Sequence, residues 1–296
     1  MKTIILFAVR ILFKIGLLTP IRVARLKFFY KLHRWPDFEH PKDINEKINW
    51  LKFYGDTSKW SLLADKYAVR GYLESIGYGD LLVGLYGKWD NVDDIDWDSL
   101  PDRFVMKINS GCGDVVICRD KSKLDKVKVM KHFNQAMSEG WGDLSGEPHY
   151  SLIKSCVIAE ELLDASTQPC SSGSMVDYKI WCFAGVPKYI ACCYNREGFR
   201  LDHAIFDTDW HYHPEWAEYT AHCRKPEQLL PRPVCLDRML EIAGNLTKEF
   251  PAVRLDMYEV NGKVYFGEFT FTSNGGYMDN YSKEFLTLLG DSCHLY

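Results

Sequence analysis

The sequence lacks several features that would place it in a secreted or membrane-spanning class. Its ten cysteines include no Cys-x-x-Cys pair and follow no secretory signal, so we expect free thiols in a reducing compartment. The first 18 residues are apolar, but Arg10 and Lys14 interrupt them. No small-residue cleavage site follows, which argues against a signal peptide, and two cations at hydrocarbon depth argue against a spanning helix.

Acidic residues are missing from residues 1–36, which hold eight Lys or Arg. The other 260 residues carry 28 basic and 40 acidic side chains, a net charge of −12. Because the whole chain has a net charge of only −4, we expect no nucleic acid as a partner. A basic, apolar N-terminal helix suits an anionic membrane surface, and docking of that helix on the protein itself is an equal alternative. The expected localisation is cytoplasmic, peripheral on the inner face of the membrane in the first case.

Length and composition indicate a globular protein, since 47% of the 296 residues are hydrophobic and 26% are charged. Helical patterns cover residues 44–75, 121–140 and 236–249, and strand patterns cover 104–108, 115–118, 157–161, 178–183 and 188–193. Strands that repeatedly form hairpins after residue 100, mixed with helices, predict an α+β fold. The glycine-containing segment 109–114 joins two strands and opens no helix, which excludes a doubly wound dinucleotide fold.

A hairpin near the C-terminus carries two acidic residues on its two arms. Asn261-Gly262 is the strongest short-range hairpin signal, because both turn positions tolerate positive φ. Asp256 precedes this turn by five residues and Glu268 follows it by six, so a tight hairpin brings them to a similar level. Like charges across a ladder repel, and a divalent cation such as Mg²⁺ would remove that repulsion. The simpler alternative is that the carboxylates face water.

A second candidate feature is the loop Gly111-Cys112-Gly113, which can present backbone N–H groups to phosphates. It is not a Walker loop, since no Gly-Lys-Ser/Thr follows, and a plain turn is the alternative interpretation. Lys107 lies in the apolar strand before the loop. A lysine there needs a partner for its charge, and a phosphate is one.

Taken in order, these pieces resemble the ATP-grasp superfamily, and more closely its TupA-like branch, named for teichuronopeptide biosynthesis. The resemblance covers roughly residues 30–285. It is carried by Asn45-Glu46-Lys47-Ile48-Asn49-Trp50-Leu51-Lys52, Leu63-Ala64-Asp65-Lys66-Tyr67-Ala68-Val69-Arg70, Phe104-Val105-Met106-Lys107, Ile158-Ala159-Glu160-Glu161, Asp177-Tyr178-Lys179, Val253-Arg254-Leu255-Asp256 and Phe266-Gly267-Glu268-Phe269-Thr270-Phe271-Thr272.

The resemblance implies an ATP-grasp fold, with two antiparallel-sheet lobes clasping ATP after a helical N-terminal region. We accordingly expect a basic segment over 1–36, a helical or α/β subdomain over 37–100, and the ATP-grasp lobes over 101–296. Metal, nucleotide and catalytic roles would be divided among a dozen residues. Asp256 and Glu268 would hold Mg²⁺ with Thr270, which stands where many ATP-grasp enzymes carry Asn; Lys66, Lys107, Ser110, Gly111 and Gly113 would contact the phosphates, Glu160 and Glu161 adenine and ribose, Lys179 the γ-phosphate or acyl phosphate, and Arg254 a carboxylate or phosphate.

The resemblance also implies an activity: ATP would phosphorylate a carboxylate, and an amine would attack the acyl phosphate to give an amide. The carboxylate would belong to a uronic acid or amino acid of a cell-surface polysaccharide, such as a capsule, or of its precursor. A glycan-modifying kinase, a glycosyltransferase-like protein and a non-catalytic nucleotide-binding module are the alternatives. Asp114 supports the last one, because the branch usually reads Asn-His-Gly-Ser-Gly-Gly where this chain has a carboxylate at the end of the loop.

Overall fold

The structure is a computed structural model that describes residues 16, 18–139, 142, 146–169 and 172–295. The chain divides into two compact units, the first comprising Met1–Asp56 and Ala165–Tyr296 and the second Thr57–Asp164. Most of the predicted N-terminal segment before Leu18 lies outside the described residues. The predicted boundaries at residues 36 and 100 stay a prediction.

The second unit is built on a four-stranded antiparallel sheet with the order β1-β4-β2-β3. Its strands are β1 (Leu85–Trp89), β2 (Phe104–Ile108), β3 (Val115–Cys118) and β4 (Val157–Glu161), and its helices are α4 (Trp60–Ala64), α5 (Ala68–Ser75) and α6 (Lys126–Glu139). In β2, side chains alternate between buried Phe104, Met106 and Ile108 and half-buried Val105 and Lys107. The buried set packs with Val129 and Phe133 of α6, so the other face is the one that carries Lys107.

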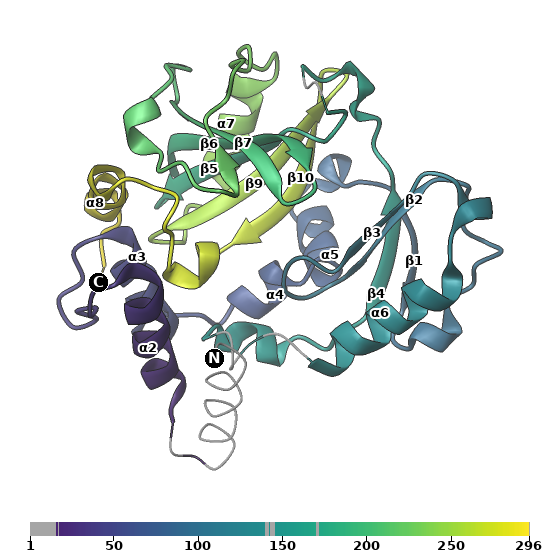
Figure 1. The fold of residues 1–296 in the computed structure, drawn as a ribbon, viewed down its shortest axis with the longest axis horizontal. Coiled ribbons are helices and arrows are strands. Elements are labelled where there is room, and N and C mark those ends of the chain that lie inside the picture. The colour runs from purple at the N-terminus through teal and green to yellow at the C-terminus, as the bar shows by residue number, and fades with distance from the viewer. Residues whose placement is uncertain (1–15, 17, 140–141, 143–145, 170–171, 296) are drawn as a thin grey trace. The chain divides into compact units, whose positions relative to one another are not determined.

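The first unit is built on a six-stranded sheet with the order β10-β9-β5-β6-β7-β8 (Figure 1). All neighbours are antiparallel except β7 and β8. Its strands are β5 (Asp177–Phe183), β6 (Val186–Glu197), β7 (Arg200–Asp207), β8 (Cys223–Arg224), β9 (Val253–Val260) and β10 (Lys263–Thr270). The turn between β9 and β10 has positive φ at Asn261 (52°) and Gly262 (72°), which confirms the predicted hairpin.

Among its described residues, the first unit contains the α-helices α2 (Pro20–Leu32), α3 (Ile44–Tyr54), α7 (Leu236–Leu246) and α8 (Lys283–Ser292). Helix α7 packs against β5 and β6, and α3 packs against α8. Asp43 caps α3 by accepting a hydrogen bond from the backbone N–H of Glu46, and Ser282 caps α8 in the same way through Phe285. Within the described part of the chain, no helix is long and apolar enough to cross a membrane.

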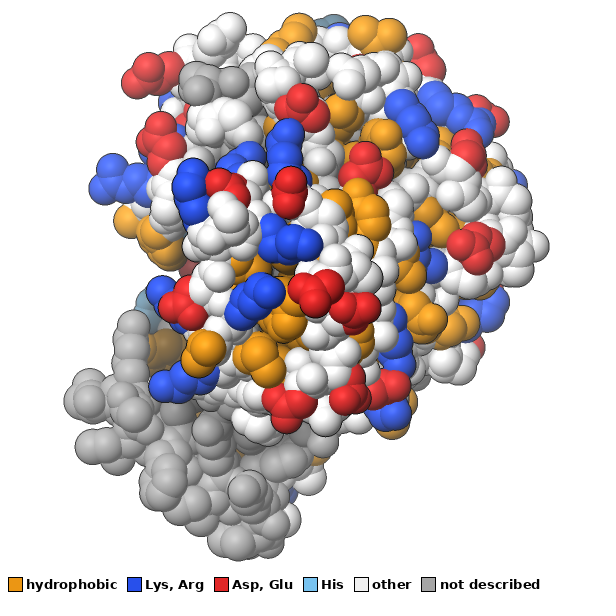
Figure 2. All heavy atoms as spheres, turned by 90° about the vertical axis from the view of Figure 1, so that its right-hand side faces the viewer, with side chains coloured by type: hydrophobic (Ala, Val, Ile, Leu, Met, Phe, Trp, Pro, Cys, Tyr) orange, Lys and Arg blue, Asp and Glu red, His pale blue; other side chains and the backbone are white. Residues whose placement is uncertain are grey.

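The predicted α+β class is confirmed, and most predicted elements form with shifts of a few residues. The helical pattern over 44–75 is three helices, and the pattern over 121–140 begins as a helix only at Lys126. Among the α-helices and strands named above, β1, β7, β8 and α8 were not predicted. On the face shown in Figure 2, acidic and basic side chains are interspersed, and neither sign covers a continuous area.

Candidate active site

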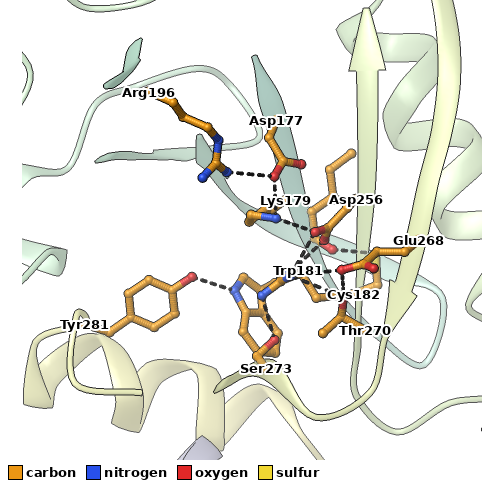
Figure 3. A network of polar contacts seen from close by, with 12 residues as sticks. Asp177, Lys179, Trp181, Cys182, Arg196, Asp256, Glu268, Thr270, Ser273 and Tyr281 are labelled. Atoms are coloured by element: carbon orange, nitrogen blue, oxygen red, sulfur yellow. Dashed lines mark hydrogen bonds and ion pairs between the residues drawn. The ribbon is translucent and has the colours of Figure 1, made fainter. Parts of the chain in front are cut away.

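Three strands of the first unit bring the predicted hairpin carboxylates beside a lysine. Lys179 on β5 pairs directly with Asp256 on β9, and Asp256 pairs with Glu268 on β10. Residues that pair directly in an antiparallel ladder project from the same face, so these three side chains form one row (Figure 3). Lys179 Nζ forms an ion pair with Asp256 Oδ2.

A bulge in β10 puts Glu268 in this row. From the turn, pairing proceeds without interruption to Phe266 opposite Met257, and the next pair is Glu268 with Asp256, so Gly267 is the extra residue. If Gly267 instead paired with Asp256, Glu268 would pair with Leu255 and project from the opposite face, because side chains alternate along a strand. A Cβ on Gly267 would lie 2.8 Å from the carbonyl oxygen of Asp256, which explains the glycine at this position.

Arg254 clamps Asp256 from the same strand face. Its Nε lies 2.7 Å from Asp256 Oδ1 and its Nη2 lies 2.8 Å from Oδ2, a bidentate pair. The same guanidinium donates to Thr270 Oγ1 at 3.2 Å and to Ser273 Oγ at 3.0 Å, and its Nη2 lies 3.9 Å from Glu268 Oε1. Arg254 therefore joins β9 to β10 and to the turn that follows it.

Asp177 extends the network on the other side of Lys179. Its Oδ2 lies 2.6 Å from Lys179 Nζ and 3.4 Å from Arg196 Nη2 (Figure 3). Its Oδ1 is buried and has no hydrogen-bond partner among the described residues. Lys179 Nζ therefore lies between the carboxylates of Asp177 and Asp256 and forms an ion pair with each.

Burial and charge shift the pKa values of this network in different directions. Burial raises the pKa of the Asp177 carboxyl above its ordinary value, and Lys179 only partly offsets that effect. Burial opposes ionisation of Asp256 too, but Arg254 and Lys179 outweigh it, and the pKa of Asp256 is lowered. The two carboxylates raise the pKa of Lys179 against the effect of burial. Lys179 and Arg254 are therefore cations at neutral pH, facing an ionised Asp256.

The donor set around Glu268 fits a hard cation. Glu268 keeps 34% of its side chain exposed, whereas Asp256 keeps 2%. Thr270 Oγ1 donates to Glu268 Oε1 at 3.1 Å, so a hydroxyl adjoins the two carboxylates. Three of the roughly four acceptor positions of Asp256 are used by Arg254 and Lys179, which leaves about one for a metal ion. All three donors are oxygens, the type that Mg²⁺ prefers.

The second unit assembles the other predicted residues. Lys107 Nζ lies 2.5 Å from Glu160 Oε2, and Arg70 Nη1 lies 3.2 Å from Glu160 Oε1, so Glu160 is shared by two cations. Glu160 is buried, and Glu161, the last residue of β4, is exposed. Its backbone N–H donates to Gly84 O at 2.8 Å.

The glycine loop of the second unit is held from both sides. Lys66 Nζ donates to Gly111 O at 2.6 Å, and the buried Asn109 exchanges hydrogen bonds with Cys156. Gly111 (φ 71°) and Gly113 (φ 94°) both have left-handed backbone, which requires glycine, and Ser110 is buried. Asp114 Oδ1 lies 3.6 Å from His132 Nε2 of α6, so the carboxylate that departs from the family pattern has a partner outside the loop.

Helix α3 fixes the segment that follows β10. Asn45, Asn49 and Lys52 lie on one helix face, are all buried, and donate to three carbonyls of this segment: Met278 O (3.0 Å), Gly276 O (3.0 Å) and Gly275 O (2.7 Å). Asn45 Oδ1 also accepts from the backbone N–H of Met278 at 2.9 Å. The polar residues of the Asn45–Lys52 motif therefore position the chain beside Ser273, which in turn binds Arg254.

Sequence reasoning missed several members of these networks. Asp177 lies two residues before Lys179, and strand alternation alone would have placed both on one face. Ser273, Arg196 and Arg70 had no such signal, because turns and long side chains bring them in from outside the strand pattern. The buried His203 on β7 was missed as well; its row runs through Cys193 to Asp177.

The chain is similar to known proteins at the level of family and of solved structure. A family model described as TupA-like ATPgrasp matches residues 46–294. No curated protein matches the chain. Among solved structures, the chain is similar to D-alanine–D-alanine ligase from Bacillus anthracis complexed with ATP, with 15% identity and a TM-score of 0.41 over 71% of this chain and 55% of that chain.

Two further solved structures show a similar degree of likeness. The ATP-grasp ligase PsnB, complexed with a phosphomimetic variant of its minimal precursor, Mg and ADP, is 10% identical, with a TM-score of 0.45 over 81% of this chain and 59% of that chain. D-alanine–D-alanine ligase from Helicobacter pylori is 12% identical, with a TM-score of 0.40 over 85% and 69%. The chain thus spans less than two thirds of the length of the first two of these three proteins.

Proposed function

Because the chain belongs to the TupA-like ATP-grasp family, whose model matches residues 46–294, we propose that it is an ATP- and Mg²⁺-dependent carboxylate–amine ligase. ATP would transfer its γ-phosphoryl group to a carboxylate oxygen, giving ADP and an acyl phosphate. An amine nitrogen would then attack the acyl carbon, form the amide bond and release phosphate. The proposed reaction would take place in the cytoplasm, the localisation that the sequence predicts, because it uses ATP.

The observation that carries this proposal is the row Lys179–Asp256–Glu268 with Arg254 beside it. Phosphoryl transfer depends mainly on positioning and on electrostatic stabilisation of the charge on the transferred group. Two buried cations held by carboxylates are already oriented, so they need not reorganise when charge develops. Lys179 would contact the γ-phosphate or the acyl phosphate, and Arg254 the substrate carboxylate or a phosphate.

The family resemblance assigns separate sets of residues to Mg²⁺ and to the nucleotide. Asp256, Glu268 and Thr270 would hold the metal ion, which when bound neutralises phosphate charge. Lys66, Lys107, Ser110, Gly111 and Gly113 would contact phosphates, and Glu160 and Glu161 would contact adenine and ribose. Lys66 supports this role by its contact with the loop carbonyl of Gly111, and the pairing of Asp114 with His132 directs that carboxylate toward α6.

The substrate class comes from the family resemblance. The carboxylate would belong to a uronic acid or to an amino acid on a cell-surface polysaccharide or its precursor, and a second substrate would donate the amine. Arg254 would attract that carboxylate by its positive charge, since its bidentate donors are already bound to Asp256.

Product analysis of the full chain with Mg·ATP and pairs of uronic acids and amines tests the reaction. We expect an amide, ADP and free phosphate in equal amounts. A phosphorylated glycan without free phosphate would show a kinase instead. ATP binding without turnover of any pair would favour the non-catalytic nucleotide-binding module.

Glu268→Gln tests the site with little risk to folding, because Glu268 is part-exposed and the amide has nearly the same shape as the carboxylate beside Thr270 and Arg254. We expect turnover to fall by about a hundredfold or more, since a metal ligand is lost. Glu227→Gln, at an exposed position of the same unit, is the matched control and should retain turnover. Equal turnover in both variants would contradict the metal assignment.

A further inference from the structure

Helix α2 is apolar on two faces. Val23, Ala24 and Phe28 are buried, and they pack with Phe38 and Tyr277. On the other side of the helix, Leu26 and Phe29 are each 43% exposed and Tyr30 is 56% exposed. Their spacing of three and four residues places these three side chains on one outer face. A surface helix ordinarily carries polar residues there.

Trp35 enlarges this exposed face beyond the end of the helix. The chain leaves α2 at His33 in left-handed conformation (φ 55°), and Trp35, 61% exposed, stacks on Phe29 with ring centroids 4.6 Å apart. We call Leu26, Phe29, Tyr30 and Trp35 the α2 patch. Single exposed apolar residues are normal on a protein surface, whereas four neighbours of which three are aromatic mark a contact surface.

Helix α2 itself carries charge of one sign. Its basic residues are Arg22, Arg25, Lys27 and Lys31, and it has no acidic residue. Of the acidic residues that follow, Asp43 and Glu46 pair with Arg34, and the exposed Glu39 lies 3.8 Å from Arg25. An aromatic surface with only cations along its helix is complementary to anionic headgroups above an apolar layer.

We propose that the α2 patch docks on an anionic lipid surface. Phe29, Tyr30 and Trp35 enter the headgroup region, where aromatic rings are favoured because one end meets hydrocarbon and the other meets water. Arg22, Lys27 and Lys31 contact lipid phosphates. At 13 residues α2 is too short to span a bilayer, so it lies in the plane of the interface. Since Phe28 on its inner face packs on Tyr277, docking also fixes the segment after β10 relative to the membrane.

Sedimentation of the full chain with sucrose-loaded vesicles tests this proposal. Vesicles of equal parts phosphatidylcholine and phosphatidylglycerol should carry the protein into the pellet, and pure phosphatidylcholine vesicles should carry far less. Added salt should release the protein, because the Debye length falls to about 3 Å at 1 M ionic strength. Equal binding to both vesicle types, or to neither, would overturn the proposal.

Two variants separate the contributions of charge and aromatic surface. Lys27→Glu with Lys31→Glu should lower partitioning onto the anionic vesicles by about tenfold or more, because each basic residue near the surface contributes to attraction. Phe29→Ser with Trp35→Ser should lower it by about tenfold through loss of apolar insertion.

Matched controls lie on other elements of the protein. Lys128→Glu with Lys131→Glu makes the same charge change on the exposed side of α6, and Phe199→Ser removes an aromatic ring that is 69% exposed on the β6–β7 hairpin. Both controls should bind vesicles as the unaltered chain does. If a control lowers binding as much as its α2 counterpart, the surface is elsewhere. If the α2 variants bind normally, the patch is covered by another protein or by the chain itself, and the proposal fails.

Discussion

At the scale of single residues, the ionisation of the buried Asp256 carboxylate depends on two neighbouring cations. Alone, its burial would favour the neutral acid, and the two cations beside it would each be costly to bury. Together, Arg254 and Lys179 keep it ionised and it keeps them in place. The same three side chains therefore serve folding and the proposed chemistry.

Substituting the two hairpin carboxylates should separate these effects. Asp256→Asn leaves two buried cations without their shared partner, and we expect it to lower the free energy of unfolding by about 3–5 kcal/mol. Glu268→Gln, at a part-exposed position, should lower it by less than about 1 kcal/mol. Urea unfolding followed by circular dichroism measures both values. An Asp256→Asn value as small as that of Glu268→Gln would show that the clamp adds no stability.

His203 is a second residue whose burial should make the stability of the fold depend on pH. Its ring is stacked on Tyr281, its Nδ1 has no hydrogen-bond partner among the described residues, and burial together with Lys179 and Arg254 lowers its pKa to about 4. The unfolded chain therefore binds a proton at higher pH than the folded one does. The stability that this neutral ring contributes is fully present above about pH 6.5 and is lost as the pH falls toward 4.

Replacing His203 should make the free energy of unfolding depend less on pH between about pH 4 and pH 7. For His203→Gln, the difference in unfolding free energy between pH 7 and pH 4 should be smaller than in the unaltered chain by about 3 kcal/mol. His211→Gln, at an exposed histidine whose pKa Asp207 raises, is the control and should not reduce this dependence on pH. Parallel curves for the unaltered chain and His203→Gln would contradict the buried neutral ring.

At the scale of elements, strands in which polar and apolar residues alternate could be predicted from the sequence. Strands without that alternation could not. Strands β2, β5, β9 and β10 have clear patterns, and the sequence placed Lys107, Lys179 and Asp256 on them correctly. Strand β7 was missed because Leu201 to Phe206 are buried on both faces, so no alternation of polar and apolar residues remains. Helix α8 had usable signals in its Ser282 cap and its apolar spacing, which the prediction did not use.

Long-range contacts between elements were beyond sequence reasoning. The motif Asn45–Lys52 served as a sign of family resemblance, and nothing in it indicated that its polar side chains bind carbonyls more than 200 residues away. Helical periodicity shows that Asn45, Asn49 and Lys52 share a face. It cannot show what that face contacts, because buried polar residues on a helix accept many kinds of partner.

Asn45→Ala tests whether this helix holds the segment after β10. The change leaves the N–H and C=O of Met278 buried without their partner, and we expect the free energy of unfolding to fall by about 2–3 kcal/mol. Asn245→Ala, on the exposed side of α7, should change it by less than about 0.5 kcal/mol. Calorimetry or urea unfolding measures the difference. Equal values for the two variants would mean that α3 does not anchor this segment.

On the scale of the whole molecule, nucleotide binding should appear as stability. A ligand that binds only the folded chain raises its unfolding free energy, by about 2.7 kcal/mol at a hundred times its dissociation constant. For a chain of 296 residues such a gain should raise the thermal midpoint by about 4 °C with Mg·ATP, since the entropy of unfolding is about 2.1 cal/mol/K per residue. ATP with a chelator and Mg²⁺ alone are the controls and should shift it less. An unchanged midpoint at every ATP concentration would contradict the proposed nucleotide site.

The extra residue in β10 has a consequence for how this hairpin can vary among related proteins. Its arms tolerate exchange of one residue type for another, but Glu268 lies opposite Asp256 only because Gly267 is left out of the pairing. Pairing of Gly267 with Asp256 would turn Glu268 toward the apolar side of the sheet, whereas loss of Gly267 would leave the two acids opposite each other in a regular ladder. Related hairpins that keep the same chemistry should therefore either retain a bulge at this position or lack this one residue, whatever the other intervening residues are.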